Sequence, residues 1–204
     1  MKRLMDALED MGMAPDEETM SKFQRYMELI LEWNEKVNLT SITEKDEFII
    51  KHYMDSVSVC GSSQMKAAQR IIDVGTGAGF PGIPLAILFP EKRFLLMDSL
   101  NKRIRIIAEL AREIGLKNVE FRHGRAEELA NDRNCRERFD LCVSRAVAHL
   151  AVLSEYCLPF VSVGGWFAAY KTEAAEEELH GSQHAIELLG GRLEEKLQPN
   201  IKGY

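Results

Sequence analysis

The sequence is poor in cysteine and has no cysteine pair at the spacing of a metal or redox site. Its four cysteines, at positions 60, 135, 142 and 157, form no C-x-x-C motif and no cluster typical of metal ligands. We therefore expect reduced thiols in a cytosolic protein and no bound metal.

Signals for membrane insertion and secretion are also lacking. The uncharged run 156–170 contains a proline and two glycines, so we expect a buried strand region there and not a membrane span. Three acidic residues fall within the apolar pattern of the first ten residues, which argues against a signal peptide. These features predict a cytoplasmic protein.

Positive charge is scarcer than negative charge. The chain has 26 Lys and Arg residues against 32 Asp and Glu residues, a formal net charge of −6. This balance argues against a general nucleic-acid binder, although it allows a local basic face. A length of 204 residues with 46% hydrophobic residues suits one α/β domain with a small helical addition.

The stretch 71–84 organises the predicted fold. It reads Ile-Ile-Asp-Val-Gly-Thr-Gly-Ala-Gly-Phe-Pro-Gly-Ile-Pro, an apolar strand followed by alternate glycines and the start of an apolar helix. Gly75, Gly77 and Gly79 permit positive φ and let a ligand approach bare backbone, and the helix N-terminus adds unpaired N–H groups. This order of elements is typical of a doubly wound nucleotide-binding domain.

The glycine spacing is compatible with two kinds of ligand. Counted from Gly77, it fits a dinucleotide fingerprint; counted from Gly75, it is Asp-x-Gly-x-Gly-x-Gly, which suits S-adenosylmethionine better. The first turn glycine should follow the strand at once, as Gly75 does, and Phe80 then fills the slot of the third dinucleotide glycine. We therefore favour S-adenosylmethionine, with a glycine turn that binds no ligand as the alternative.

Two regions are predicted along the chain. Residues 1–60 should form an N-terminal helical cap, and residues 61–204 the main domain, with a linker over 61–69. The cap shows one apolar helical stripe, made of Phe23, Met27, Ile30, Trp33 and Val37. A second cap helix is expected over 44–60, where His52 and Ser56 lie four residues apart on one face.

Strands and helices alternate from 71 to 171. This pattern predicts a mostly parallel, doubly wound α/β sheet with helices on both faces. Asp98, Arg145 and Lys171 lie at the carboxyl ends of predicted strands, where ligands of open α/β sheets collect. Asp98 follows Gly75 by 23 residues, about where a ribose-binding acid belongs.

Several motifs together resemble the RsmG (GidB) family of small-subunit ribosomal RNA methyltransferases. They are WNEKVNLTS at 33–41, HYMDS at 52–56, DVGTGAGFPGIP at 73–84, DS at 98–99, SRA at 144–146 and YK at 170–171. The resemblance runs over nearly the whole chain, and its Gly-Phe-Pro-Gly-Ile-Pro extension is far more specific than the glycines alone.

The resemblance implies a class I methyltransferase fold with S-adenosylmethionine as the methyl donor. The implied acceptor is the N7 atom of guanine 527, in the 530 loop of 16S ribosomal RNA, within the 30S subunit or an assembly intermediate; we expect a monomer. The implied donor site comprises the glycine turn and neighbouring strand ends: Gly75, Gly77, Gly79, Phe80, Asp98, Ala126, Glu127 and Arg145.

Methylation at guanine N7 needs little acid–base chemistry. The N7 atom already carries a lone pair, so its main requirement is an in-line approach to the methyl carbon. We therefore expect no metal and no dedicated general base. Arg145 and Lys171 are predicted to position RNA phosphate or guanine O6, with His52 as a partner from the cap.

Two basic groups are candidates for RNA contact. The first shares the rim of the donor site and consists of Arg145, Lys171, His52, Lys51 and Lys36. The second lies on the helix predicted over 101–115 and consists of Lys102, Arg103, Arg105 and Arg112. We favour the first group, because Arg145 and Lys171 end neighbouring strands beside the donor, where the N-terminal helices would add His52, Lys51 and Lys36.

The sequence departs from the family pattern in two places. Lys171 is followed by Thr172 where the family usually has glycine, which puts the shape of that turn in doubt. Relatives also continue past the position of Tyr204 into a final strand and often a basic tail. We therefore expect either a shortened chain or a sheet without that edge strand.

Three alternative functions remain open. One is a nicotinamide-dependent oxidoreductase, which shares the glycine turn and the ribose acid. Phe80 and the lack of a catalytic proton donor near a substrate domain count against it. Another is a ribosome-assembly module that binds the donor without turnover, and the last is a methyltransferase with a different substrate.

Overall fold

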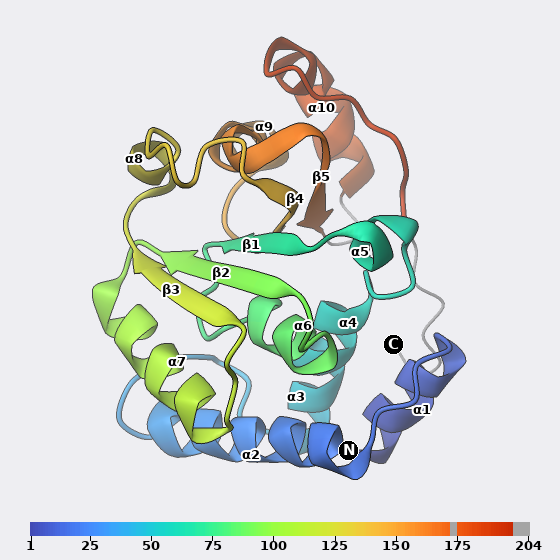
Figure 1. Cartoon of the computed structure of the whole chain (residues 1–204), viewed down its shortest axis with the longest axis vertical. Helices are drawn as coiled ribbons and strands as arrows, with labels where there is room; N and C mark the ends of the chain where they lie inside the picture. Colours follow the sequence, from blue (N-terminus) through green and yellow to red (C-terminus); the bar gives the residue numbers. More distant parts are fainter. Residues whose placement is uncertain (172–174, 198–204) are drawn as a thin grey trace.

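The computed structural model describes residues 1–171 and 175–197 and contains one sheet of five parallel strands (Figure 1). The strand order is β3-β2-β1-β4-β5. The strands are β1 Arg70–Val74, β2 Arg93–Asp98, β3 Val119–His123, β4 Phe139–Arg145 and β5 Val161–Tyr170. The predicted doubly wound, parallel α/β fold is confirmed. The expectations about Thr172 and about a chain end at Tyr204 fall outside the described residues.

Helices precede the sheet and connect its strands. The N-terminal ones are α1 Lys2–Asp10, α2 Glu17–Asn34, α3 Lys45–Phe48, the π-helix η1 Ile49–Met54, α4 Asp55–Val57 and α5 Ser63–Ala67. Those after β1 are α6 Gly82–Leu88, α7 Asn101–Glu113, α8 Ala126–Leu129, α9 Leu150–Cys157, the 3₁₀ turn η2 Leu158–Phe160 and α10 Ala175–Leu188. None of the helices described is long and apolar enough to cross a membrane.

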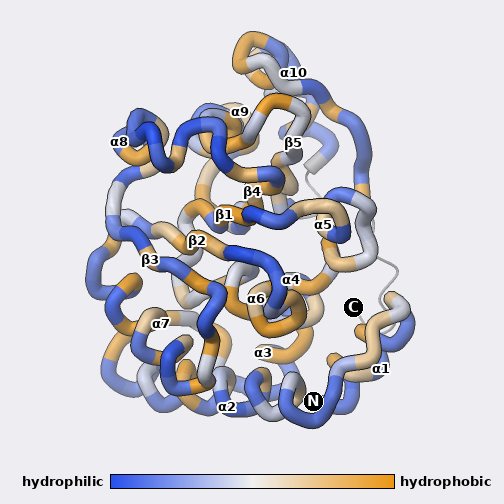
Figure 2. The backbone as a smooth tube through the Cα atoms, in the orientation of Figure 1, coloured by the Kyte–Doolittle hydropathy of each residue, from blue (hydrophilic) through white to orange (hydrophobic). Residues whose placement is uncertain are grey.

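Alternate residues of the central strands face two separate apolar cores. Ile71 of β1 belongs to the core shared with α6, α7 and the N-terminal helices, whereas Ile72 belongs to the core beneath α9. Burial on both faces explains why β1 and β2 read as nearly continuous apolar runs. Helix α6 is apolar along its length in Figure 2 and is buried from Gly82 to Ile87.

The order of the strands fixes where a ligand would bind. β1 lies between β2 and β4, so the chain leaves it in one direction to build β2 and β3 and later returns on the other side to add β4 and β5. This reversal is the topological switch point of a doubly wound sheet, and ligands bind outside the carboxyl ends of the strands there. Asp73, Asp98 and Arg145 all lie at or near those ends.

The N-terminal helices pack directly on the sheet domain. Tyr26 of α2 donates a hydrogen bond to the carbonyl of Ala78 in the glycine turn, at 2.9 Å. Tyr53 of η1 donates to the carbonyl of Phe23, and their rings meet edge-to-face with centroids 4.9 Å apart. Helices of the region 1–60 therefore share one continuous core with β1, α6 and α7.

Two predicted segments differ in detail from the structure. The segment expected as one helix over 44–60 is α3, the π-helix η1 and then α4. The expected linker over 61–69 is wrong in part, because it contains α5, whose first turn is capped by the Ser62 hydroxyl accepting from Met65 N at 3.1 Å.

Candidate functional site

The turn after β1 is held by the buried carboxylate of Asp73. Its Oδ2 atom accepts hydrogen bonds from Thr76 Oγ1 at 2.7 Å and from Gly82 N at 2.8 Å. Among the described residues, its Oδ1 atom is buried without a hydrogen-bond partner. Burial raises the pKa of Asp73 to about 7, against the lowering effect of its hydrogen bonds.

The three alternate glycines of the turn are required for different reasons. All adopt positive φ, +74° at Gly75, +59° at Gly77 and +86° at Gly79. A side chain at Gly75 would collide with Val147, and one at Gly79 would collide with Tyr26 and Ile83. At Gly77 a Cβ would meet nothing within 4 Å. Gly77 is therefore the position where bare backbone faces open space, as a ligand cradle requires.

Asp98 fixes the orientation of that open glycine. It ends β2, its side chain is 5% exposed, and its Oδ2 accepts from Gly77 N at 2.9 Å. Its Oδ1 accepts from Leu100 N, also at 2.9 Å. Leu100 itself is 51% exposed beside the turn. The predicted ribose acid is thus joined to the glycine turn, with an exposed apolar side chain next to it.

Arg145 joins the end of β4 to the N-terminal helices. Its Nη1 donates to the carbonyl of Lys51 at 2.9 Å and to Asp55 Oδ2 at 2.6 Å. Its Nη2 donates to His52 Nδ1 at 3.1 Å. The Arg145 and Asp55 side chains are only 15% and 24% exposed, so this ion pair is largely shielded from solvent. Most of the guanidinium is therefore committed to contacts within the protein.

His52 lies between Arg145 and Phe80. Arginine can only donate, so Nδ1 of His52 must accept, and the ring proton lies on Nε2, 2.7 Å from Thr40 Oγ1. The ring stacks on Phe80 with centroids 4.3 Å apart and an interplanar angle of 2°. Burial, and then the charge of Arg145, lowers the pKa of His52 to about 3. His52 is therefore neutral at physiological pH, with both nitrogens occupied.

A π-helix presents these groups. η1 supplies the carbonyl of Lys51 and the ring of His52, and Asp55 follows at the start of α4. Such π-helical segments are rare and occur frequently at functional sites. His52 and Ser56, which were expected on one helical face, meet through the backbone: the Ser56 hydroxyl donates to the carbonyl of His52 at 2.5 Å, and it does not join the ring.

The remaining predicted residues lie apart from this network. The ammonium of Lys171 donates to the carbonyl of Ala148 at 2.7 Å and forms an ion pair with Glu178 of α10 at 2.5 Å. Ala126 and Glu127 begin α8 after β3, and Glu127 pairs with Arg125 at 3.0 Å. Lys171 therefore ties α10 to the loop after β4.

Several contributors could not be identified from the sequence. Asp55 and Thr40 lie within the quoted motifs, but their contacts with Arg145 and His52 depend on the tertiary fold. Val147 covers Gly75 while remaining 40% exposed, and the preceding Ala146 has a φ of +55°. No sequence signal marks that loop, because a positive φ at alanine is a local strain imposed by its surroundings.

The neutrality of His52 predicts a specific pH dependence of stability. Its folded pKa lies below the unfolded value, so its contribution is present above about pH 6.5 and is lost as pH falls towards 3. Between pH 6.5 and 5.5 wild type should lose about 1 kcal/mol more unfolding free energy than His52→Gln, whose amide does not titrate. Urea titrations of both proteins at each pH test this, and parallel pH profiles would contradict it.

The fold and the glycine turn are those of class I methyltransferases. The structure is similar to a ribosomal protein L11 methylase from Lactobacillus delbrueckii subsp. bulgaricus, with a TM-score of 0.56 and 17% identity over 74% of each chain. It is also similar to a putative O-methyltransferase from Klebsiella pneumoniae, with a TM-score of 0.53 and 18% identity over 81% of this chain and 77% of that one. At these identities the likeness concerns the fold alone.

Sequence comparison then gives the family. The model for GidB, rRNA small subunit methyltransferase G, matches residues 19–198. The chain is 48% identical to the ribosomal RNA small subunit methyltransferase G of Alkaliphilus metalliredigens, over 95% of this chain and 81% of that one. It is 49% identical to the protein of that name from Lachnoclostridium phytofermentans, over 95% and 80%. The chain belongs to this family, which confirms the resemblance seen in the motifs.

Family membership decides between the ligands that the glycine spacing allowed. The protein is a methyltransferase that uses S-adenosylmethionine, as the motifs predicted, and the nicotinamide-dependent oxidoreductase is excluded. The turn fits this donor, because Gly77 leaves open the space that a side chain would fill.

Proposed function

We propose that the protein transfers a methyl group from S-adenosylmethionine to N7 of guanine 527, in the 530 loop of 16S ribosomal RNA. The substrate would be the RNA of the 30S subunit or of an assembly intermediate. The names of the relatives support small-subunit ribosomal RNA as the substrate class. The choice of guanine N7 depends on the chemistry of the site.

One observation carries that choice: the titratable groups around the glycine turn are either already engaged or, like the free Oδ1 atom of Asp73, fully buried. His52 is neutral with both ring nitrogens in contact, and Asp98 accepts two backbone N–H groups. Asp55 is paired with Arg145. None of these groups is placed to remove a proton from an acceptor, as O-methylation or exocyclic N-methylation would require. Guanine N7 reacts without losing a proton.

The chain's own residues would divide the work of holding the donor, which supplies an electrophilic methyl group on its sulfonium. We propose that the turn at Gly77 receives the methionine part and that Asp98 meets the ribose. Ala126, Glu127 and the exposed Leu100 would flank the adenine. Val147 must turn away from Gly75 for the donor to lie there, and its 40% exposure leaves room for this rotation.

Residues at the contact between the N-terminal helices and the sheet would shape the position of the acceptor base. His52 holds the Phe80 ring and one edge of the Arg145 guanidinium, so it would act as a positioning residue. Arg145 retains N–H groups beyond those in its contacts and would direct them to guanine O6 or a phosphate. Holding the base and the methyl group in line is an orientation effect, which does not require a proton to move.

Product analysis tests this function directly. Unmethylated 30S subunits and naked 16S RNA would be incubated with the protein and S-adenosylmethionine. Nuclease digestion with mass spectrometry should detect 7-methylguanosine, and strand cleavage after borohydride and aniline treatment should map it to position 527. Donor binding without any RNA methylation would instead favour the assembly module, and a methyl group on another atom would refute the choice of N7.

Removing the Asp98 carboxylate should weaken donor binding. Asp98→Ala loses a charged acceptor to Gly77 N and Leu100 N besides any contact with the ribose, and hydrogen bonds to charged groups contribute about 1.5–3 kcal/mol. The dissociation constant of S-adenosylmethionine should rise more than about tenfold in calorimetry. Asp98→Asn keeps one acceptor oxygen, so its dissociation constant should lie between those of wild type and Asp98→Ala. An unchanged constant in a folded Asp98→Ala protein would exclude the role.

A further inference from the structure

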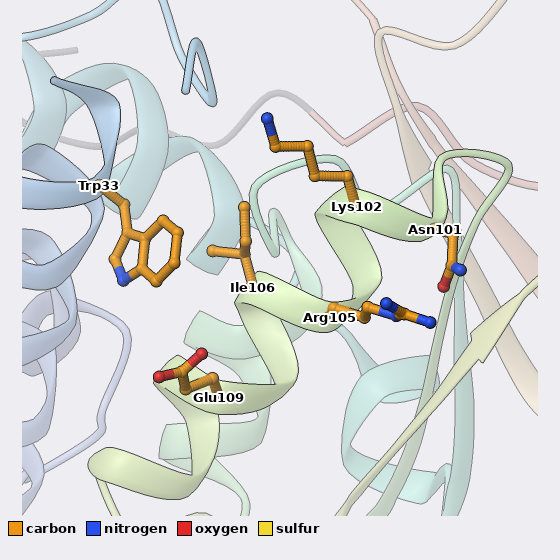
Figure 3. Close-up of a pocket in the computed structure, with 6 residues that line it drawn as sticks. All are labelled: Trp33, Asn101, Lys102, Arg105, Ile106 and Glu109. Atoms are coloured by element: carbon orange, nitrogen blue, oxygen red, sulfur yellow. The ribbon is translucent and has the colours of Figure 1, made fainter. Parts of the chain in front are cut away.

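A groove between α2 and α7 combines an aromatic ring with cations. Its volume is about 450 Å³, and it is lined by Trp33, Asn101, Lys102, Arg105, Ile106 and Glu109. Figure 3 shows Trp33 of α2 facing Ile106 of α7, with Lys102 and Arg105 along the same helix. Lys36 adds a further cation, with its ammonium 5.8 Å from the centroid of the Trp33 ring.

The cations of this groove are available to an outside partner. In the part of the chain that the structure describes, no acidic side chain lies within ion-pair distance of Lys36, Lys102 or Arg105, and Lys102 and Arg105 are exposed. Arg145 and Lys171, in contrast, are bound to Asp55 and Glu178. In a chain of net charge −6, unpaired cations on one surface favour a polyanionic ligand.

Both walls of the groove lead to the donor site. Lys102 follows Asp98 by four residues, so their Cα atoms are at most about 15 Å apart. On the other wall, Asn34 Oδ1 accepts from Leu39 N at 2.8 Å and Thr40 N at 3.0 Å, which orders the chain between Trp33 and the His52 contact of Thr40. A strand that leaves the acceptor position therefore needs only a few nucleotides to reach the groove.

We propose that this groove binds a single-stranded segment of the RNA substrate next to the target base. A base would stack on the exposed part of Trp33, and flanking phosphates would meet Lys36, Lys102 and Arg105. Glu109 would accept from N–H groups on the edge of the stacked base. The inference rests on the proposed function, because it takes RNA as the substrate, and it adds a second RNA-binding surface beside the acceptor position at Arg145.

Paired substitutions test the groove in the full-length protein. Lys102→Ala/Arg105→Ala should weaken binding to a 16S RNA transcript about tenfold or more and make the salt dependence shallower by about 1.4 in log–log slope, since each single-strand phosphate contact contributes about 0.7. Lys66→Ala/Arg93→Ala is the matched control: both residues are exposed, and Arg93 lies at the amino end of β2, on the opposite edge of the sheet from Asp98. The control should bind RNA like wild type.

Substitutions at Trp33 test the contribution of stacking separately from that of charge. Trp33→Leu should weaken RNA binding at least about fivefold, whereas Trp33→Phe keeps a ring and should stay near wild type. Donor affinity should be unchanged in all these variants, because none contacts the glycine turn. Wild-type affinity and salt slope in Lys102→Ala/Arg105→Ala would overturn the inference. The inference would also be overturned if this variant bound 30S subunits weakly but naked RNA normally, because that result would indicate a protein partner. If the proposed function is wrong, the wild-type protein itself will methylate no RNA, which is a different result from a binding defect in these variants.

Discussion

Gly77→Val is expected to abolish binding of S-adenosylmethionine while leaving the protein folded. Gly77 is the turn glycine whose added Cβ would meet nothing within 4 Å, so its branched side chain would enter the open space over the turn. A donor placed against that backbone would have to be displaced, and we expect its dissociation constant to rise by at least about a hundredfold, or about 2.7 kcal/mol. Calorimetry with S-adenosylmethionine measures this directly.

A matched variant removes the effect of backbone strain. Gly115, just past α7, has a φ of +75° and likewise no atom within 4 Å of an added Cβ. Gly115→Val should therefore suffer similar strain, about 1–2 kcal/mol or somewhat more for a β-branched residue, but bind the donor normally. Far-UV circular dichroism and urea unfolding would show whether the two variants are comparably folded. Wild-type donor affinity in folded Gly77→Val would refute the assignment of the donor to this turn.

The neighbouring glycines would give a less clear answer. A side chain at Gly79 collides with Tyr26 and Ile83, so its substitution would disturb the contact between α2 and the turn before any ligand is involved. At Gly75 the collision is with Val147, which belongs to the loop after β4. The three glycines are equivalent in the sequence motif. Their surroundings in the structure show which of them is required for packing and which leaves space for a ligand.

Local patterns were enough to predict the sheet. β1, β2 and β4 are short apolar segments that end in a charged residue or a glycine turn, and they alternate with helical segments. The placement of Asp98 and Arg145 at one rim follows from parallel strands alone, because all their carboxyl ends lie at the same edge. These predictions required no knowledge of which segments touch.

Contacts between distant segments could not be predicted in the same way. Arg145 meets Asp55 across 90 positions, and no periodicity couples residues so far apart. Lys171 was expected to contact RNA, but it pairs with Glu178 of α10. The π-helix of η1 also escapes prediction, since its residues have the same spacing pattern as an α-helix.

Arg145→Met should have the second large effect, on both stability and methylation. The substitution leaves Asp55, the carbonyl of Lys51 and Nδ1 of His52 without the guanidinium that they share. Removing one partner of a fully buried pair costs about 3–5 kcal/mol, and this pair is partly exposed, so we expect a loss of about 2 kcal/mol of unfolding free energy. Methylation of 30S subunits should fall more than about a hundredfold in kcat/KM.

A double variant distinguishes a structural role of Arg145 from a functional one. Asp55→Asn/Arg145→Met also removes the carboxylate charge that Arg145 neutralises, so it should recover part of the stability that Arg145→Met loses. Its methylation should nevertheless stay low, because no guanidinium remains to direct the acceptor base. Recovery of stability and of kcat/KM together would show that Arg145 only joins the cap to β4. Recovery of stability alone would support its action on the substrate, since a fold restored without activity leaves the missing cation as the cause.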